Sequence, residues 1–182
     1  MVLIWIIIIV ALLILITFGY YNKFIVLSNR IDNSLSQIDV QLKRRADLIP
    51  NLINTVKGFA KQEKSIMTSV NEARKALVGA KSLPDKMKAN NVLEGALGKL
   101  FAIAENYPDL KSNTNFLELQ RELSSTEDRV AYARQNYNDS ILTYNNMVEK
   151  FPGLIFAGMF NKQKKDYIKI AEVEKKVVEV KF

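Results

Sequence analysis

The chain opens with an uninterrupted apolar run and then changes to an amphipathic pattern. Residues 2–18 read VLIWIIIIVALLILITF and contain no charged side chain. A helix of about 20 residues is about 30 Å long, which matches the hydrocarbon thickness of a bilayer. Tyr20 and Tyr21 follow directly, and aromatic rings of this kind favour the headgroup level. The pattern predicts a membrane-spanning helix over residues 1–21.

The flanks of this segment indicate whether it is retained and how it is oriented. No basic residue precedes the apolar run, and no small-residue cleavage site follows it, which is unlike a cleaved secretory signal. Lys23 and Arg30 lie on its C-terminal side, and basic residues favour the cytoplasmic side of a membrane. We therefore expect a retained single-pass anchor in the cell membrane, with the N-terminus outside and the larger domain in the cytoplasm.

Beyond the anchor, apolar residues recur at steps of three and four, which is the helical period. No stretch alternates as a half-buried strand would. Amphipathic helices of this kind bury their apolar stripes against one another. The expected fold is therefore all-α, with an antiparallel four-helix bundle over residues 22–151. Its four apolar runs extend over Phe24 to Leu48, Leu52 to Leu77, Val92 to Ile103 and Phe116 to Phe151.

Pro50 leaves two arrangements of this bundle open. A proline can open a new helix after a tight turn at Asp47–Ile49, or it can kink one continuous helix. The turn gives four separate runs and is favoured here. A candidate protein-contact tip would then be formed by Lys43, Arg44, Arg45 and Asp47. The alternative is a long kinked helix through Pro50, packed with two further helices.

The region after residue 151 differs from the bundle in composition. Residues 154–160 are apolar, lysines follow closely, and residues 173–182 form a charged, valine-rich tail. We treat residues 152–182 as a third region, a membrane-proximal segment with a C-terminal tail. Its apolar part either folds over the end of the bundle as core or lies at the membrane surface. In the second case the contact residues are Leu154, Ile155, Phe156, Phe160, Lys162, Lys164 and Lys165.

The residue inventory limits the chemistry that the chain could perform. It contains no Cys and no His. Zinc sites, Ser-His-Asp and Cys-His nucleophiles, and the Glu-x-x-His motifs of di-iron bundles all need these residues. The glycines form neither a P-loop nor a dinucleotide-binding turn. We therefore expect no enzymatic activity, no cofactor and no bound metal.

Several short motifs resemble those of the LemA family of bacterial membrane proteins. They are NRIDN at 29–33, QIDVQLKRRADLIPNL at 37–52, YPDLK at 107–111, LQREL at 119–123, TEDRVAYAR at 126–134, YND at 137–139, YNN at 144–146 and FP at 151–152. The resemblance implies an N-terminal transmembrane helix with a short outside N-terminus, and a cytoplasmic helical bundle. It carries no catalytic residue over to this chain.

The net charge of +7 bears on the choice of partner. Basic residues are interleaved with acidic ones and no aromatic stacking platform is evident, so nucleic acid is not expected. The expected partners are the lipid bilayer and a protein with an acidic surface, and self-association is compatible with the pattern. The favoured function is a membrane-anchored scaffold or interaction module at the cytoplasmic face. The alternative is a bundle that binds a lipid or small ligand in its interior.

Overall fold

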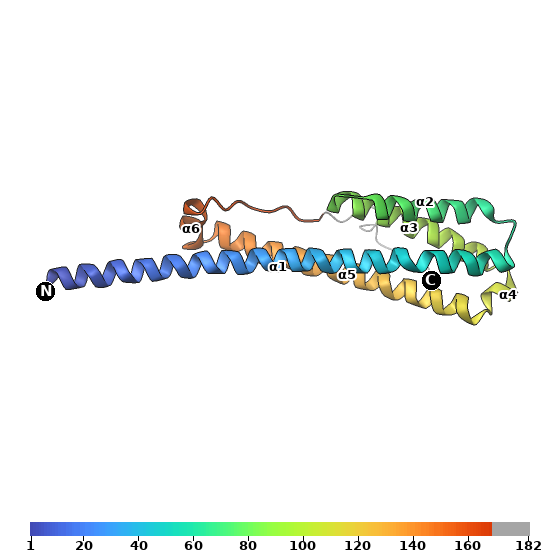
Figure 1. Cartoon of the computed structure of the whole chain (residues 1–182), viewed down its shortest axis with the longest axis horizontal. Helices are drawn as coiled ribbons and strands as arrows, with labels where there is room; N and C mark the ends of the chain where they lie inside the picture. The colour runs from blue at the N-terminus through green and yellow to red at the C-terminus, as the bar shows by residue number, and fades with distance from the viewer. Residues whose placement is uncertain (169–182) are drawn as a thin grey trace, which may run out of the picture. The chain divides into compact units, whose positions relative to one another are not determined.

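A computed structural model describes residues 1–168, and α-helix is the only regular secondary structure in that part of the chain (Figure 1). The all-α prediction is thereby confirmed. The predicted tail at residues 173–182 lies outside the described residues. In chain order the helices are α1 (Val2–Phe59), α2 (Lys64–Gly79), α3 (Leu83–Ala104), α4 (Pro108–Lys111), α5 (Thr114–Glu149) and α6 (Gly153–Met159).

Contacts between residues divide the chain into two compact units. The first unit combines Met1–Leu35 with the chain from Arg134 onward, and the second is Ser36–Ala133. Helices α1 and α5 therefore each contribute one part to the first unit and one part to the second. Each unit buries its own apolar side chains.

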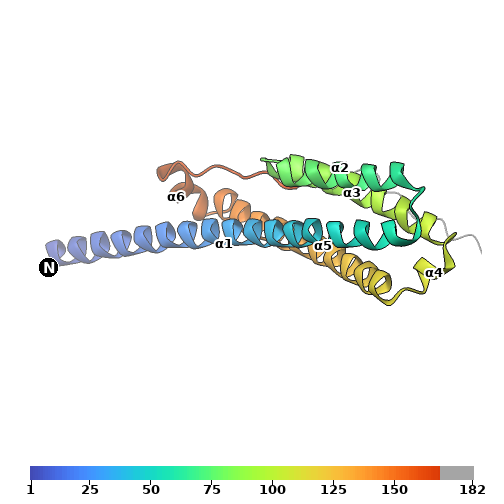
Figure 2. The ribbon, with the colours of Figure 1, turned by 45° about the vertical axis from the view of Figure 1, so that its right-hand side comes forward.

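The second unit is a helical bundle built around α2 and α3, which lie side by side (Figure 2). Polar contacts fasten both helices to α1: Arg74 donates to the carbonyl of Ala46 at 2.8 Å, and Lys86 pairs with Asp39 at 2.7 Å. The ring of Phe101 on α3 meets Phe116 on α5 edge to face. The core of this unit includes Ile38, Ile49, Leu52, Val70, Leu93, Leu100, Leu110, Leu123 and Val130.

Helix α1 continues through Pro50, so the predicted turn at Asp47–Ile49 is wrong, and the part of the alternative that runs one long helix through Pro50 is correct. A proline inside a helix costs about 3 kcal/mol, because one hydrogen bond is lost and the ring crowds the preceding turn. Burial of an aliphatic side chain contributes about 1.5–3 kcal/mol. Several such side chains on one face of α1 outweigh the proline, and the chain turns only at residues 60–63. The buried residues around Pro50 are Ala46, Ile49, Leu52, Ile53 and Val56.

The first unit contains the start of α1, the end of α5, and α6. Two serines mark a close approach of α1 and α5, with Ser34 Oγ 3.1 Å from Ser140 Oγ. Helix α1 is also long and apolar enough to cross a membrane, and none of its most apolar window is buried. An apolar stretch that the protein leaves uncovered needs a non-aqueous environment, which supports the predicted anchor. The core of this unit includes Phe24, Leu27, Ile31, Ile141, Tyr144, Val148 and Ala157.

Candidate membrane-contact site

Aromatic side chains gather in the first unit where the apolar run of α1 ends. The rings of Tyr20 and Phe156 are stacked, with centroids 4.3 Å apart. Tyr21 meets Phe160 edge to face at 5.2 Å. These contacts hold α6 against the start of the polar part of α1. We call this cluster the aromatic collar, formed by Tyr20, Tyr21, Phe24, Tyr144, Phe156 and Phe160.

Small residues allow α6 to approach the end of α5 closely. Gly153 is buried, and a Cβ atom at this position would overlap the carbonyl oxygen of Met147. Ala157, one helical turn later, is also buried. The amide of Leu154 in α6 donates to the carbonyl of Lys150, the residue that follows α5, at 2.9 Å. Glycine is required here by the close approach.

Helix α6 presents a second apolar face that the described residues leave uncovered. The exposed fractions are 55% for Leu154, 59% for Ile155 and 57% for Met159, and the preceding Phe151 is 80% exposed. Phe156, by contrast, is partly buried against α1. The core interpretation of residues 154–160 therefore fits Phe156 and Phe160, and the membrane-surface interpretation stays a prediction for the exposed side chains. Phe156 and Phe160 pack into the unit, whereas Leu154 and Ile155 face outward.

The three lysines assigned to the membrane surface have partners or shelter within the chain. Lys164 forms an ion pair with Glu149, and the hydrogen bond to that carboxylate raises the pKa of Lys164. The ammonium of Lys165 lies over the ring of Tyr144, 5.4 Å from its centroid. Lys162 is partly buried. Lys164 and Lys165 therefore contact α5, and the exposed part of the candidate contact is apolar apart from Lys164, whose side chain is 60% exposed.

Two asparagines of α5 hold the extended segment that follows α6. The side-chain amide of Asn145 donates to the carbonyl of Lys165 and accepts from its amide, both at 2.9 Å. Asn138 makes the same pair of hydrogen bonds to Ile168, at 3.2 and 3.0 Å. Sequence reasoning missed this clamp. The available signal was the Tyr-Asn pair that recurs after seven residues, at 137–138 and 144–145, because a spacing of seven keeps both amides on one helix face.

The tyrosines of these two pairs line the same side of the unit. Burial raises the pKa of Tyr144 above its ordinary value. Burial also raises the pKa of Tyr137, and the carboxylates of Asp32 and Asp166 add to that shift. Both phenols therefore stay neutral well above neutral pH, as suits side chains that pack against an apolar core.

Replacing Asn145 with alanine is expected to release the extended segment from α5. The substitution removes two hydrogen bonds to the main chain of Lys165, each contributing about 0.5–1.5 kcal/mol. Hydrogen exchange measured by mass spectrometry should become faster over residues 162–168, while helix content stays unchanged. Asn146→Ala serves as the control, because no side-chain hydrogen bond of Asn146 is present among the described residues. Equal exchange in both variants would contradict the clamp.

The predicted protein-contact tip is not a tip, because α1 does not turn at Pro50. Lys43 pairs with Asp47 at 3.3 Å, and Arg44 with Glu122 at 2.8 Å. Arg45 is 1% exposed and points into the second unit. The continuous helix places Arg45 on the same buried stripe as Leu42 and Ile49, which removes it from the surface. The sequence held this signal, because the steps from 42 to 45 and from 45 to 49 are helical.

Arg45 has few partners for a buried guanidinium. Its Nη1 donates to Asn90 Oδ1 at 3.0 Å, and its Nη2 lies 3.6 Å from Glu127 Oε2. Burial lowers the pKa of Arg45, while the charges of Glu127 and Glu94 act in the opposite direction. Its Nε has no hydrogen-bond partner within residues 1–168. Arg45 is thus a structural residue of the second unit and is unavailable for surface contact.

Comparison with known proteins places the chain in a family. The LemA family model matches residues 34–182. Magnetosome protein MamQ of Magnetospirillum gryphiswaldense is 29% identical over 158 residues, covering 72% of this chain and 58% of the relative. Protein LemA of Metamycoplasma hominis is 27% identical over 137 residues, covering 73% of this chain and 61% of the relative. The chain thus spans about three-fifths of these curated relatives. Because the family model covers most of its length, this membrane-associated protein belongs to the LemA family.

Proposed function

We propose that this protein is a non-catalytic, single-pass membrane scaffold. The start of α1 anchors it, the aromatic collar seats α6 on the bilayer surface, and the helical part presents binding surfaces on the cytoplasmic side. The observation that carries the proposal is the uncovered apolar face of α6, formed by Leu154, Ile155 and Met159, with the exposed Phe151 just before the helix.

The depth of α6 follows from its contact with Tyr20. Tyrosine rings at the end of a membrane-spanning helix favour the headgroup level. Phe156 stacks on Tyr20, and α6 has only seven residues, or about 10 Å of helix. Its exposed side chains therefore lie close to the boundary between headgroups and acyl chains. Transfer of a large apolar side chain out of water contributes about 1.5–3 kcal/mol when complete, so partial burial of the four exposed apolar side chains stabilises this position substantially.

Labelling at single cysteines tests the position of α6 at the bilayer surface directly, because the chain contains no cysteine of its own. Ile155→Cys, carrying an environment-sensitive fluorophore, is placed in the full chain and reconstituted into bilayers. We expect blue-shifted emission and strong quenching by spin-labelled lipids. Val92→Cys is the matched control, because Val92 is equally exposed, at 56%, but lies in the second unit; it should report water.

Water-like emission from Ile155→Cys with unchanged helix content would contradict the proposed position of α6 at the bilayer surface.

The control variant Val92→Cys also tests the orientation of the chain in the membrane. The positions of Lys23 and Arg30 favour a cytoplasmic domain. A membrane-impermeant thiol reagent should therefore leave Val92→Cys unlabelled in intact cells and label it after the membrane is opened. Labelling in intact cells would reverse the proposed orientation.

A further inference from the structure

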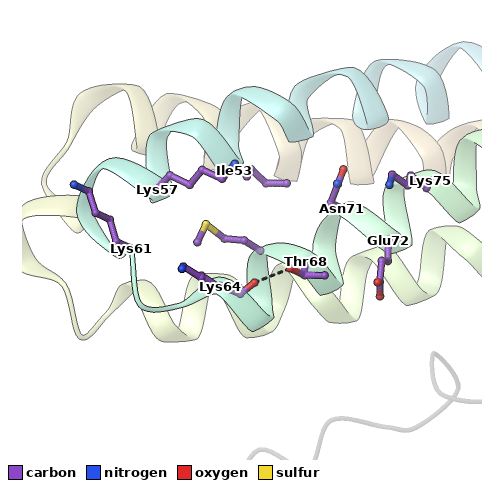
Figure 3. Close-up of a pocket in the computed structure, with 9 residues that line it drawn as sticks. Ile53, Lys57, Lys61, Lys64, Thr68, Asn71, Glu72 and Lys75 are labelled. Carbon is purple, nitrogen blue, oxygen red and sulfur yellow. Dashed lines mark hydrogen bonds between the residues drawn. The ribbon is translucent and has the colours of Figure 1, made fainter.

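A groove in the second unit runs between the end of α1 and the first turns of α2 (Figure 3). Its volume is about 680 Å³. Ile53 from α1 and Met67 from α2 form its floor, and both are buried. A hollow of this size with an apolar floor is in the range of ligand and peptide sites.

The rim of the groove is strongly basic. Four lysines line it together with a single acidic residue, Glu72. None of the four forms an ion pair within residues 1–168, whereas Lys43, Arg44, Lys86 and Lys111 each pair with a carboxylate. The four lysines and Glu72 therefore give the groove lining an excess of positive charge. The four lysines are Lys57, Lys61, Lys64 and Lys75.

We propose that this groove binds an acidic, partly apolar segment of a partner protein. This inference rests on the proposed scaffold function and names the class of partner that the scaffold would hold. A helix with one apolar face can place one or two side chains over the exposed edges of Ile53 and Met67 and the methylene stems of the rim lysines, as in other helix-in-groove complexes. Acidic residues on its flanks then meet the ammonium groups of the rim. Complementary charge of this kind speeds association and selects the partner.

The lining of the groove favours a protein segment over lipid or nucleic acid. All but two of the lining residues are polar or charged, so a lipid tail finds no continuous apolar surface. No aromatic residue and no arginine lines the groove, so bases find nothing to stack on. Phosphate groups would still be attracted to the amines. Lipid and nucleic acid therefore become outcomes of the test.

The test uses the full chain in its native membrane, with a photoreactive residue in place of Thr68, an exposed residue of the groove. The captured molecule is digested, and the cross-linked peptide is sequenced. We expect a segment of another protein that has net negative charge and at least one apolar anchor. The double variant Lys61→Glu/Lys64→Glu should reduce its capture about tenfold, because two attractions become repulsions.

The double variant Lys88→Glu/Lys99→Glu is the matched control. It changes the net charge equally, and both lysines are exposed on α3, away from the groove lining. Its capture yield should stay near that of the unmodified chain. Equal loss in both double variants would mean that bulk charge alone attracts the partner. Capture of lipid, nucleic acid, this chain itself or nothing would also overturn the inference.

The same variants separate this inference from the membrane scaffold. Emission from a fluorophore at Ile155→Cys reports the seat of α6, which involves none of the groove lysines. If capture fails while that emission stays blue-shifted, the groove inference fails and the membrane seat stands. If the emission is water-like, the proposed scaffold geometry fails whatever the groove captures.

Discussion

Replacing Arg45 with alanine is expected to lower the free energy of unfolding by about 3–5 kcal/mol. The side chain is 1% exposed, so truncation leaves a cavity of nearly its whole volume. It also leaves Asn90 Oδ1, buried in the second unit, without the hydrogen bond that Arg45 donates. Loss of the contact with Glu127 adds less to this change, because the Glu127 side chain is 47% exposed and its carboxylate can be solvated by water instead. Urea unfolding of the full chain in detergent, followed by circular dichroism, measures the loss.

Arg44→Ala provides the matched control for this experiment. Arg44 is the neighbouring residue and pairs with Glu122, but both side chains are nearly half exposed. Exposed ion pairs of this kind contribute about 0–1 kcal/mol, so Arg44→Ala should unfold close to the unmodified chain. Equal losses from the two substitutions would show that Arg45 is not buried in the folded protein.

Arg45→Met separates packing from charge at the same position. Methionine fills most of the space and removes a guanidinium whose Nε lacks a partner among the described residues. Buried ion pairs can often be replaced by apolar residues at little cost. We therefore expect Arg45→Met to recover at least half of the stability that Arg45→Ala loses. A loss as large as that of alanine would assign the stabilisation to the charged contacts with Asn90 and Glu127.

The features that sequence alone predicted correctly are those set by local pattern. The apolar run of residues 2–18 and the three- and four-residue steps beyond it depend on near neighbours, so the anchor candidate and the all-α fold follow from them. The backbone conformation at Pro50 is instead decided by the burial of neighbouring side chains in the tertiary structure. Its local preference allows a turn, but the stripe from Ile49 to Val56 favours one helix because α2 and α3 are available to cover it. The misplaced tip at Arg45 followed from that single choice.

The packing of residues 154–160 could be predicted only in part, for a similar reason. Composition identifies residues 154–160 as an apolar segment, but it does not show which side chains pack into the unit and which are exposed. That assignment needs Tyr20 and Tyr21, which lie far away in sequence and cover Phe156 and Phe160. The asparagine clamp depends on contacts across 20 and 30 residues. The seven-residue spacing of the two Tyr-Asn pairs places both amides on one helix face, but it does not identify their main-chain partners.

Gly153→Ala is expected to displace α6 from the end of α5. The added methyl group would overlap the carbonyl oxygen of Met147, a main-chain atom within α5. The helix cannot yield at one carbonyl, so α6 must move and its contacts with the aromatic collar weaken. Overpacking of this kind costs about 1–3 kcal/mol. Hydrogen exchange over residues 153–160 should accelerate by about tenfold or more, since 1.4 kcal/mol corresponds to a factor of ten.

Gly158→Ala tests the same substitution in the same helix without the close approach. A Cβ atom at Gly158 meets open space, and alanine favours a helix over glycine by about 1 kcal/mol. Exchange over α6 should therefore stay unchanged or slow down. If both alanine variants exchanged alike, α6 would not be held against Met147.

A displaced α6 no longer holds Ile155 beside Tyr20. Gly153→Ala should therefore also weaken lipid quenching at Ile155→Cys, whereas Gly158→Ala should leave that quenching intact. This paired result would connect a single main-chain contact to the seat of the protein on its membrane.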